Sequence, residues 1–495
     1  MLTMRSALER AERLFGENTA IIDAEARFTW AEHLDRVKRL AGVLQENGIG
    51  KGDRFGIICR NTWRHCELIH AGYWNGSVPV PVNYRLAPPE IRYILEDAQT
   101  SQLFIEGAFL DLLKTGELAG WSTDAVCIPG GGPTTELRSS DDLISTATPV
   151  EGNESGEEED AILLYTGGTT GRSKGVRLTH RNVFSNGQQC TAPMKINAGD
   201  VYLHVAPMFH SADLLGSGYT QAGAAHAYLP VFTPVNLLQA FQDYGVTCAM
   251  MAPTMIILTL QEPEFDTFDL SSLDRVYYGS SPMAVEWIRR TMEAFPTANI
   301  QQGYGLTETS PIVSFNPNDA IQLGTIGKPV AGTSVKVVDA DGNDVPLGEP
   351  GELCVQGPQV MKGYWQREEE TRNAIDENGW FHTGDIAVLQ DDGYIKIVDR
   401  KKDMILVSGF NVYPNEVEDV VAAHPDVLEA AAVGVADENA GEAIKLFVVS
   451  KNSQLDAETL RAWCKKELTA YKVPKYIEFR DELPKTNVGK VLRRQ

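Results

Sequence analysis

A loop rich in glycine and threonine is the part of this sequence best suited to binding phosphate. The stretch LLYTGGTTGRSKGV (163–176) starts as an apolar strand and ends near Lys174. It offers backbone N–H groups and hydroxyls to an anion through Thr166, Gly167, Gly168, Thr169, Thr170 and Gly171. A Walker A loop needs Gly-Lys-Ser/Thr, whereas here Arg172 and Ser173 separate Gly171 from Lys174, so this is not a Walker A loop. The alternative is a flexible surface loop with a solvated lysine.

Three more stretches carry polar residues that could do chemistry: QQGYGLTET (301–309), GWFHTGD (379–385) and KTNVGKVLRR (485–494). The first brings Tyr304, Thr307 and Glu308 together, and a capped helix N-terminus would also explain it. The second ends at Asp385 and could be an ordinary turn. The third contains Lys490 and could be a solvated tail. Each stretch alone is explained as well by structure as by function.

Composition excludes several classes of protein. The net charge of −23 argues against a nonspecific nucleic-acid binder and against an anionic membrane surface as partner, because both need clustered basic residues. Seven cysteines, an odd number without a C-x-x-C pair, indicate reduced thiols and no zinc site. The N-terminus lacks the apolar core of a secretory signal, and no stretch is apolar enough to span a membrane. We therefore expect a cytoplasmic protein that binds no nucleic acid and has no integral membrane segment.

The first third of the chain alternates between helix and strand patterns. Thr29 and Glu32 predict a helix capping box, which is followed at helical spacing by Leu34, Val37, Leu40, Ala41 and Leu44. Strands are predicted at 55–59, 78–82 and 102–106, with helical stretches between them. This alternation predicts an α/β fold with mostly parallel sheets covered on both faces.

The pattern changes in the last third. From Val335 to Ile397, short strands separated by turns rich in Gly and Asp predict an antiparallel, β-barrel-like unit. The polar segment RKKDMI (400–405) is a plausible boundary, and the residues after it resemble a small α+β domain. Because 495 residues are too many for one core, we expect a large N-terminal domain with several subdomains, residues 1–400, and a small C-terminal domain, residues 401–495.

The order of these motifs resembles the adenylate-forming superfamily of acyl-CoA synthetases, aryl and fatty acid CoA ligases and adenylation domains. The family's loop reads Y-T-S-G-T-T-G-x-P-K-G, where this chain has YTGGTTGRSKG. The similarity continues through FTWAEHL, PMFH, GYGLTE, GYW, GWFHTGD, DRKKDMI and PKTNVGK, and so covers nearly the whole chain. The resemblance implies that the protein uses ATP to join a carboxylic acid to coenzyme A through an acyl-adenylate and releases AMP.

The resemblance also implies roles for the polar residues around the phosphates. The loop from Thr166 to Lys174 would hold the β- and γ-phosphates. Thr166 and Glu308 would hold Mg²⁺, since a hydroxyl and a carboxylate suit a hard cation. Thr307 would contact the α-phosphate.

The nucleoside would be held by a second group of residues. Tyr304 would lie against the adenine, next to Gly303, and Ser280 would add hydrogen-bonding capacity beside the adenine. Asp385 would accept hydrogen bonds from both ribose hydroxyls, with Arg400 supporting it.

Three further residues would serve adenylation, the domain rotation that follows it, and the transfer of the acyl group to coenzyme A. Lys490 resembles the lysine that bridges the attacking carboxylate and the α-phosphate, where a fixed cation counters charge that builds in the transition state. The small domain of this family rotates between the steps, and Lys402 occupies the hinge position. Gly409, in the turn SGF (408–410), would line the tunnel for the pantetheine arm.

The acyl pocket is the least determined part of the site. His210 follows PMF and would lie near the substrate carboxylate, whereas adenylation domains for amino acids have an aspartate there. Asp213 could meet a polar group of the acid, although a solvated or helix-capping acid is the simpler interpretation. The residues expected to shape the walls are Tyr278, Gly303 and Val313.

The loop departs from the family pattern at two positions, and one alternative function stays open. Gly167 replaces the usual serine and Ser173 the usual proline, which leaves the lysine and both threonines in place. We expect a fatty, a short branched or hydroxy, or an aryl acid as substrate, and the chain could form a homodimer. The alternative is an adenylating enzyme that passes its acyl group to a carrier protein. A binding protein without activity is disfavoured because it would not need Lys490.

Overall fold

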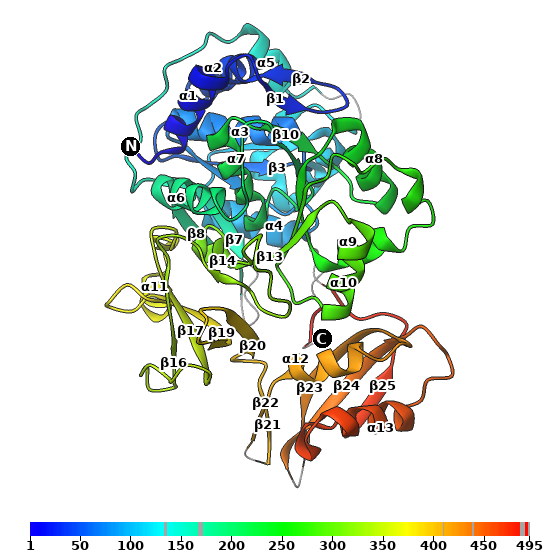
Figure 1. Ribbon diagram of the computed structural model, residues 1–495. Helices are drawn as coiled ribbons and strands as arrows, with labels where there is room; N and C mark the ends of the chain where they lie inside the picture. The colour runs from blue at the N-terminus through cyan, green and yellow to red at the C-terminus, as the bar shows by residue number, and fades with distance from the viewer. Residues whose placement is uncertain (133–135, 167–171, 409, 438–439, 486–490, 494–495) are drawn as a thin grey trace.

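The computed structural model describes residues 1–132, 136–166, 172–408, 410–437, 440–485 and 491–493, which form a large and a small domain (Figure 1). The described residues form four sheets in the large domain and one in the small domain. The α/β fold with several sheets and a small C-terminal domain that the sequence predicts is confirmed.

A four-stranded parallel sheet, ordered β4-β3-β5-β6, lies near the start of the chain. It and its neighbours comprise α1 (Met4–Phe15), α2 (Trp30–Glu46), β3 (Arg54–Ile58), α3 (Trp63–Asn75), β4 (Val78–Pro81), α4 (Pro88–Asp97), β5 (Gln102–Glu106), the 3₁₀ helices η1 (Gly107–Lys114) and η2 (Gly116–Trp121), β6 (Val126–Ile128) and α5 (Ser140–Thr146). The three strands predicted at 55–59, 78–82 and 102–106 are confirmed as β3, β4 and β5.

A nine-stranded sheet, ordered β15-β14-β13-β12-β11-β9-β10-β1-β2, forms the centre of the large domain. Its strands are β1 (Thr19–Ile22), β2 (Arg27–Thr29), β9 (Val201–His204), β10 (Ala225–Tyr228), β11 (Cys248–Met251), β12 (Arg275–Tyr278), β13 (Asn299–Gly305), β14 (Ile312–Phe315) and β15 (Lys328–Pro329). Between them lie α6 (His180–Thr191), η3 (Ser211–Leu215), α7 (Gly216–Ala222), α8 (Pro234–Tyr244), α9 (Pro253–Leu260), η4 (Phe265–Thr267), α10 (Val285–Ala294) and η5 (Thr307–Thr309). The six neighbouring strands β13, β12, β11, β9, β10 and β1 are parallel, as expected for a sheet built from strand–helix–strand units.

Two antiparallel sheets complete the large domain. One consists of β7 (Asp160–Thr166), β8 (Lys174–Thr179) and β18 (Gly363–Tyr364), followed by α11 (Glu368–Ala374). The other consists of β16 (Ser334–Val338), β17 (Pro350–Gln356), β19 (Phe381–Leu389) and β20 (Ile395–Arg400). The second sheet is the antiparallel unit that the sequence predicts after Val335, and its order β16-β17-β19-β20 makes it an open sheet, with β16 and β20 as edges, and not a closed barrel.

The small domain packs two helices against one sheet. Its elements are β21 (Ile405–Val407), β22 (Phe410–Val412), α12 (Pro414–Ala422), β23 (Val427–Asp437), β24 (Gly441–Ser450), α13 (Ala457–Glu467), η6 (Ala470–Lys472) and β25 (Tyr476–Phe479). Strand β20 pairs inside the large domain, and β21 pairs with β24 inside the small one, so the chain passes between domains after Arg400 and before Ile405. The exact boundary at residue 400 stays a prediction.

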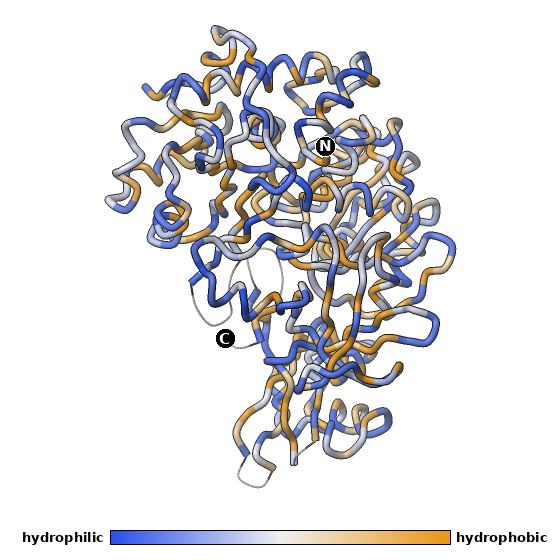
Figure 2. The backbone as a smooth tube through the Cα atoms, turned by 90° about the vertical axis from the view of Figure 1, so that its left-hand side faces the viewer, coloured by the Kyte–Doolittle hydropathy of each residue, from blue (hydrophilic) through white to orange (hydrophobic). Residues whose placement is uncertain are grey.

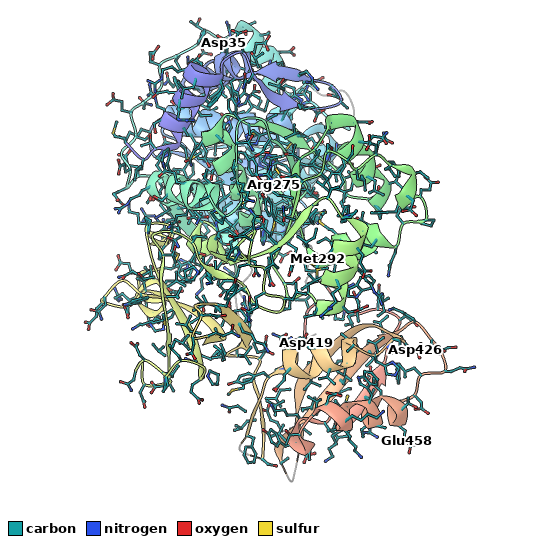
Figure 3. All side chains as sticks on the ribbon, in the orientation of Figure 1. Asp35, Arg275, Met292, Asp419, Asp426 and Glu458 are labelled. Carbon is teal, nitrogen blue, oxygen red and sulfur yellow. The ribbon has the colours of Figure 1, made fainter. Side chains whose placement is uncertain are left out.

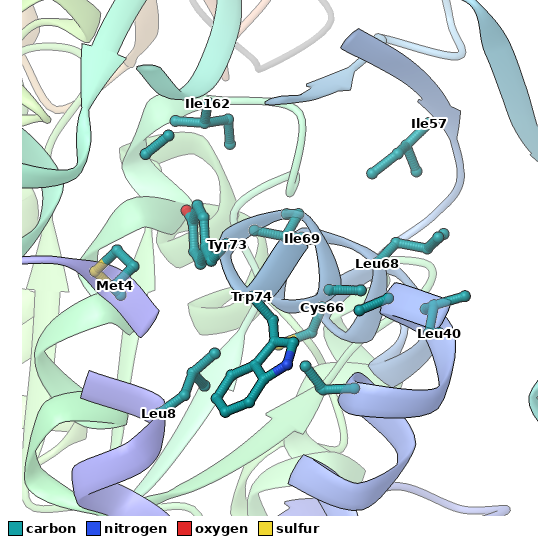
Figure 4. Packing of buried hydrophobic residues seen from close by; sticks show 14 of the residues in the cluster. Met4, Leu8, Leu40, Ile57, Cys66, Leu68, Ile69, Tyr73, Trp74 and Ile162 are labelled. Carbon is teal, nitrogen blue, oxygen red and sulfur yellow. The ribbon is translucent and has the colours of Figure 1, made fainter. Parts of the chain in front are cut away.

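Helix α3 shows how local sequence and packing together fix the large domain. Nearly every residue of α3 is buried, which is the pattern of a helix enclosed on all sides. Figure 4 shows Trp74 and Ile69 of this helix between side chains of α1, α2 and the strands around them. The capping box predicted at the start of α2 is confirmed, because the Thr29 side chain accepts from the Glu32 N–H and the Glu32 carboxylate accepts from the Thr29 N–H.

Hydropathy alternates along the chain in both domains (Figure 2), as expected where helices and strands bury one face. No helix among the described residues is long and apolar enough to cross a bilayer. All seven cysteines are buried and free, in agreement with the prediction of reduced thiols.

Candidate functional site

Four neighbouring strands of the nine-stranded sheet end at one edge and carry several predicted site residues. Strands β9, β11, β12 and β13 are parallel, so their carboxyl ends lie together. His210 follows β9, Ser280 follows β12, and Tyr304 stands near the end of β13. In open α/β sheets, ligands bind outside the carboxyl ends of the strands. The carboxyl ends of these four strands are therefore the expected position of the binding site.

A hydrogen-bonded trio joins this edge to the antiparallel sheet. The Tyr304 hydroxyl donates to Asp385 Oδ2 over 2.6 Å, and Arg400 Nε lies 2.9 Å from Asp385 Oδ1. The second contact follows from sheet register, because Asp385 on β19 faces Arg400 on β20. Burial and the Asp385 carboxylate raise the pKa of Tyr304, so the phenol stays protonated and donates. A carboxylate has about four acceptor positions, so Asp385 retains capacity for two further donors.

A second group consists of Glu308 and Lys174, which both contact Tyr364. The Tyr364 hydroxyl donates to Glu308 Oε1 over 2.9 Å, and Lys174 Nζ lies 5.0 Å from the centre of the Tyr364 ring. Strand pairing places Thr166 opposite Lys174 at the end of the β7–β8 hairpin. Burial raises the pKa of Glu308, while the Tyr364 hydrogen bond and the charges of Arg400 and Lys174 lower it. Glu308 is therefore within electrostatic range of both cations.

The segment after β9 contacts the segment after β13. Ser211 Oγ and Thr307 Oγ1 are 3.0 Å apart. His210 is the N-cap of η3, and its Nδ1 accepts from the Ala212 N–H over 3.2 Å. This hydrogen bond orients the ring. A neutral imidazole that accepts at Nδ1 carries its proton on Nε2. The family resemblance implies that His210 lies near the substrate carboxylate and that Thr307 contacts the α-phosphate. The structure places these two residues on segments that touch.

Asp213 is not solvated, so that part of its interpretation as a solvated or helix-capping acid was wrong; it stands in the first turn of η3, whose N-cap is His210. Asp213 is 8% exposed, and its Oδ1 lies 2.5 Å from His204 Nδ1 at the end of β9. His204 Nε2 is 2.9 Å from His226 Nδ1, and His226 Nε2 is 3.2 Å from Thr220 Oγ1. Burial lowers the pKa of His226 and keeps that imidazole neutral. This series of buried hydrogen bonds anchors η3, which begins immediately after His210. The local sequence gives no indication of these contacts.

Two glycines let the strand ends approach one another. A Cβ at Gly303 would lie 2.7 Å from the Phe315 ring, and a Cβ at Gly279 would lie 2.5 Å from the Gly303 carbonyl oxygen. Ser280 follows with φ of 67°, a left-handed conformation that is uncommon for serine. The backbones of β12 and β13 are therefore in direct contact where the adenine and acyl sites are predicted to adjoin.

Several predicted residues lie outside the described part of the chain: Gly167, Gly168, Thr169, Thr170, Gly171, Gly409 and Lys490. Their roles stay predictions. Lys402 is described and lies in the turn between the domains, where the Asp403 N–H donates to the Arg400 carbonyl oxygen over 2.9 Å. Tyr364 is the functional candidate that sequence reasoning left without a role, although it stands in the GYW motif on which the resemblance partly depends.

Comparison with known families agrees with this fold and site. Residues 8–365 match the profile of the AMP-binding enzyme family, and residues 416–490 match that of the AMP-binding enzyme C-terminal domain. The chain belongs to the AMP-binding enzyme family. Within it, the protein is an acyl-CoA synthetase, an acid–thiol ligase that joins a carboxylic acid to coenzyme A through an acyl-adenylate at the expense of ATP.

Individual relatives cover almost the entire chain. A long-chain-fatty-acid–CoA ligase of Escherichia coli is 38% identical over 98% of this chain and 92% of its own length. A feruloyl-CoA synthase of an Amycolatopsis species is 35% identical over 98% and 96%. The crystal structure of ATP-bound MatB from Rhodopseudomonas palustris is 30% identical over 98% of this chain and 97% of that chain, with a TM-score of 0.89. The apo form of MatB, at 29% identity over 99% and 97%, gives a TM-score of 0.81.

Proposed function

We propose that this acyl-CoA synthetase activates a fatty acid in two steps, adenylation with Mg²⁺ and ATP and then transfer of the acyl group to CoA, with rotation of the small domain between them. The observation that carries the proposal is the Tyr304–Asp385–Arg400 trio beside the Glu308–Tyr364–Lys174 group. One group suits a nucleoside and the other suits a metal-bound phosphate chain.

The residues present fit ATP at this edge. Asp385 has acceptor capacity left for the two ribose hydroxyls, and Arg400 and Tyr304 hold its carboxylate in place. Tyr304 would offer its ring to the adenine. Lys174 would supply positive charge to the β- and γ-phosphates, and Thr307 would donate to the α-phosphate.

The residues present also fit Mg²⁺. Glu308 and Thr166 offer oxygen atoms, which this cation prefers, and two protein ligands leave room for waters and phosphate oxygens. When bound, the cation would neutralise charge on the phosphates. Tyr364 would keep the Glu308 carboxylate oriented toward it. Coenzyme A as the thiol follows from the family, and Gly409 is its proposed contact.

Two TM-scores support the assignment of a conformational state. The whole chain superposes better on ATP-bound MatB, with a TM-score of 0.89, than on apo MatB, with 0.81. We infer that the arrangement in Figure 1 is the one that serves adenylation.

An apolar acid is favoured by the side chains that surround the strand ends. Met250, Met251, Tyr278 and Phe315 are all buried there and carry no charge, and Phe209 precedes His210. Fatty acid specificity also agrees with the E. coli relative, whereas the feruloyl-CoA synthase makes an aromatic acid the main competitor.

A panel of acids tests the proposal. AMP release with Mg·ATP would be measured with and without CoA for short, branched, hydroxylated, aromatic and long-chain acids. We expect CoA-dependent release with long-chain fatty acids and at least tenfold lower kcat/KM with aromatic ones. Preference for aromatic acids would overturn the substrate class. Acid-dependent pyrophosphate exchange without CoA-dependent turnover would favour a carrier protein as acceptor.

Tyr364→Phe is expected to raise the Mg²⁺ concentration needed for half-maximal adenylation by about tenfold. The reason is that it removes one hydrogen bond to a charged group, which is worth roughly 1.5–3 kcal/mol when buried. Titration of pyrophosphate exchange with Mg²⁺ at fixed ATP would measure the change. Tyr476→Phe is the matched control, because Tyr476 is 43% exposed on the small domain. Equal Mg²⁺ requirements for the two variants would contradict the role of Tyr364.

A further inference from the structure

A part-buried ion cluster connects Arg493, near the end of the chain, to the last strand of the large domain. Arg493 Nη1 lies 2.8 Å from Asp399 Oδ1, and its Nε lies 2.9 Å from Glu418 Oε1. Nη2 lies 2.5 Å from Glu418 Oε2 and also donates to Asn415 Oδ1. We call Arg493, Asp399, Asn415 and Glu418 the hinge clamp. Its guanidinium uses the planar fork of arginine, which a lysine cannot reproduce.

The hinge clamp joins the two domains. Asp399 is on β20, which pairs with β19 in the large domain, and its side chain is fully buried. Asn415 and Glu418 are on α12 of the small domain, and Figure 3 marks this helix with Asp419 at the end of the small domain nearest the large one. The Asn415 N–H also donates to Asp399 Oδ2 over 2.7 Å. Asp399 is therefore held from the small domain at both carboxylate oxygens.

The described residues just before and just after 486–490 contact one another. Residue 491 forms a β-bridge with Lys485, and the Leu492 N–H donates to the Pro484 carbonyl oxygen over 2.8 Å. Lys485 Nζ is 2.6 Å from Glu429 Oε1. The described residues that flank 486–490 thus contact the small domain, and Arg493 also contacts Asp399 of the large domain.

The hinge clamp contains one ion pair within the small domain, Arg493–Glu418, and one between the domains, Arg493–Asp399. Burial lowers the pKa of Arg493, but Glu418 and Asp399 outweigh that effect and raise it. Burial raises the pKa of Asp399, and Arg493 is the main charge that opposes this rise. If the small domain rotates about the turn at Lys402, the Arg493–Glu418 ion pair stays intact, because both residues belong to the small domain. The Arg493–Asp399 ion pair breaks, because Asp399 belongs to the large domain. The guanidinium is never left without a carboxylate.

We propose that Arg493 and Asp399 are positioning residues that hold the small domain, and with it Lys490, in the orientation for adenylation, and that their ion pair breaks before the CoA step. This inference rests on the proposed two-step function and adds to it the contact that selects between the two domain orientations.

Asp399→Asn and Arg493→Gln test the hinge clamp by separating the half-reactions. Adenylation would be followed by acid-dependent pyrophosphate exchange, and the CoA step by single turnover of supplied acyl-adenylate. We expect adenylation to fall at least tenfold in each variant, with the CoA step unchanged within twofold or faster. Both single variants remove the Asp399–Arg493 ion pair, and Arg493→Gln also removes the contacts to Glu418 and Asn415, so the double variant should lose no more than Arg493→Gln alone. Arg480→Gln is the matched control, since Arg480 pairs with Glu478 inside the small domain, and it should change neither step.

Other outcomes would overturn the hinge clamp. Equal losses in both half-reactions would indicate a structural role alone, as would losses that add in the double variant. Unchanged adenylation in both single variants would show that the contact does not select an orientation. The proposed two-step function fails separately, namely if the unmodified protein forms no acyl-CoA or if Lys490→Ala leaves adenylation intact.

Discussion

Lys490→Ala is expected to lower the rate of acyl-adenylate formation by about 10² to 10³-fold, the usual effect of removing one group that stabilises transition-state charge. Negative charge builds on the α-phosphate as the carboxylate attacks, and a fixed ammonium counters it. Transfer of the acyl group from a supplied acyl-adenylate to CoA takes place at the acyl carbon and forms no pentacoordinate phosphorus, so it should keep its rate within twofold. Pyrophosphate exchange and single-turnover thioester formation measure the two steps.

The described residues nearest to Lys490 in sequence contact the small domain. Lys485 pairs with Glu429, and Arg493 pairs with Glu418. Lys465→Ala is a suitable control, because Lys465 is exposed on α13. Equal loss of both half-reactions in Lys490→Ala would contradict its assignment to adenylation.

Lys402→Pro is expected to slow the CoA step at least tenfold while adenylation stays within about threefold. Proline fixes φ near −65° and restricts the residue before it, so the turn from Arg400 to Asp403 loses the freedom that rotation requires. Because the arrangement in Figure 1 is inferred to serve adenylation, freezing the turn should trap the protein before the second step. Rapid-quench measurement of thioester formation from acyl-adenylate would detect it.

Lys402→Ala separates backbone freedom from side-chain chemistry. It removes the same ammonium but leaves φ and ψ free, so the rotation model requires that it transfer acyl groups far faster than Lys402→Pro. A proline variant with an unchanged CoA step would count against rotation at this turn. Similar losses in both variants would assign the effect to the side chain.

Substitutions at Lys490, at Lys402 and in the hinge clamp affect one equilibrium, that between the two orientations of the small domain. Lys490→Ala removes the chemistry of one orientation, Lys402→Pro restricts movement between orientations, and Asp399→Asn weakens the first orientation. The expected patterns differ. The first and third lower adenylation and spare the CoA step, and the second does the reverse. A protein in which all three changes lower the same half-reaction would not use domain rotation as proposed.

Much of the fold and the class of chemistry could be predicted from sequence because their signals are local. The capping box of Thr29 and Glu32 depends on residues three apart, and strands β3, β4 and β5 are short apolar runs bounded by polar turns. The sequence also showed Tyr304, Glu308 and Asp385 as polar residues in turn-like motifs. Their motifs, in order, placed the protein among acyl-CoA ligases, which the family profiles confirm.

Only the tertiary structure decided which of these side chains touch. Tyr364 reaches Glu308 from 56 residues away, Asp385 meets Tyr304 over 81, and Arg493 meets Asp399 over 94. Asp213 looked like a solvated acid until the structure placed it against His204, because burial depends on what packs around a residue and not on its neighbours in sequence. The sequence by itself thus determined which functional groups are present and the order in which they occur. The pairing of sheets and domains determined their partners, since contacts between distant segments leave no periodic or local trace in the chain.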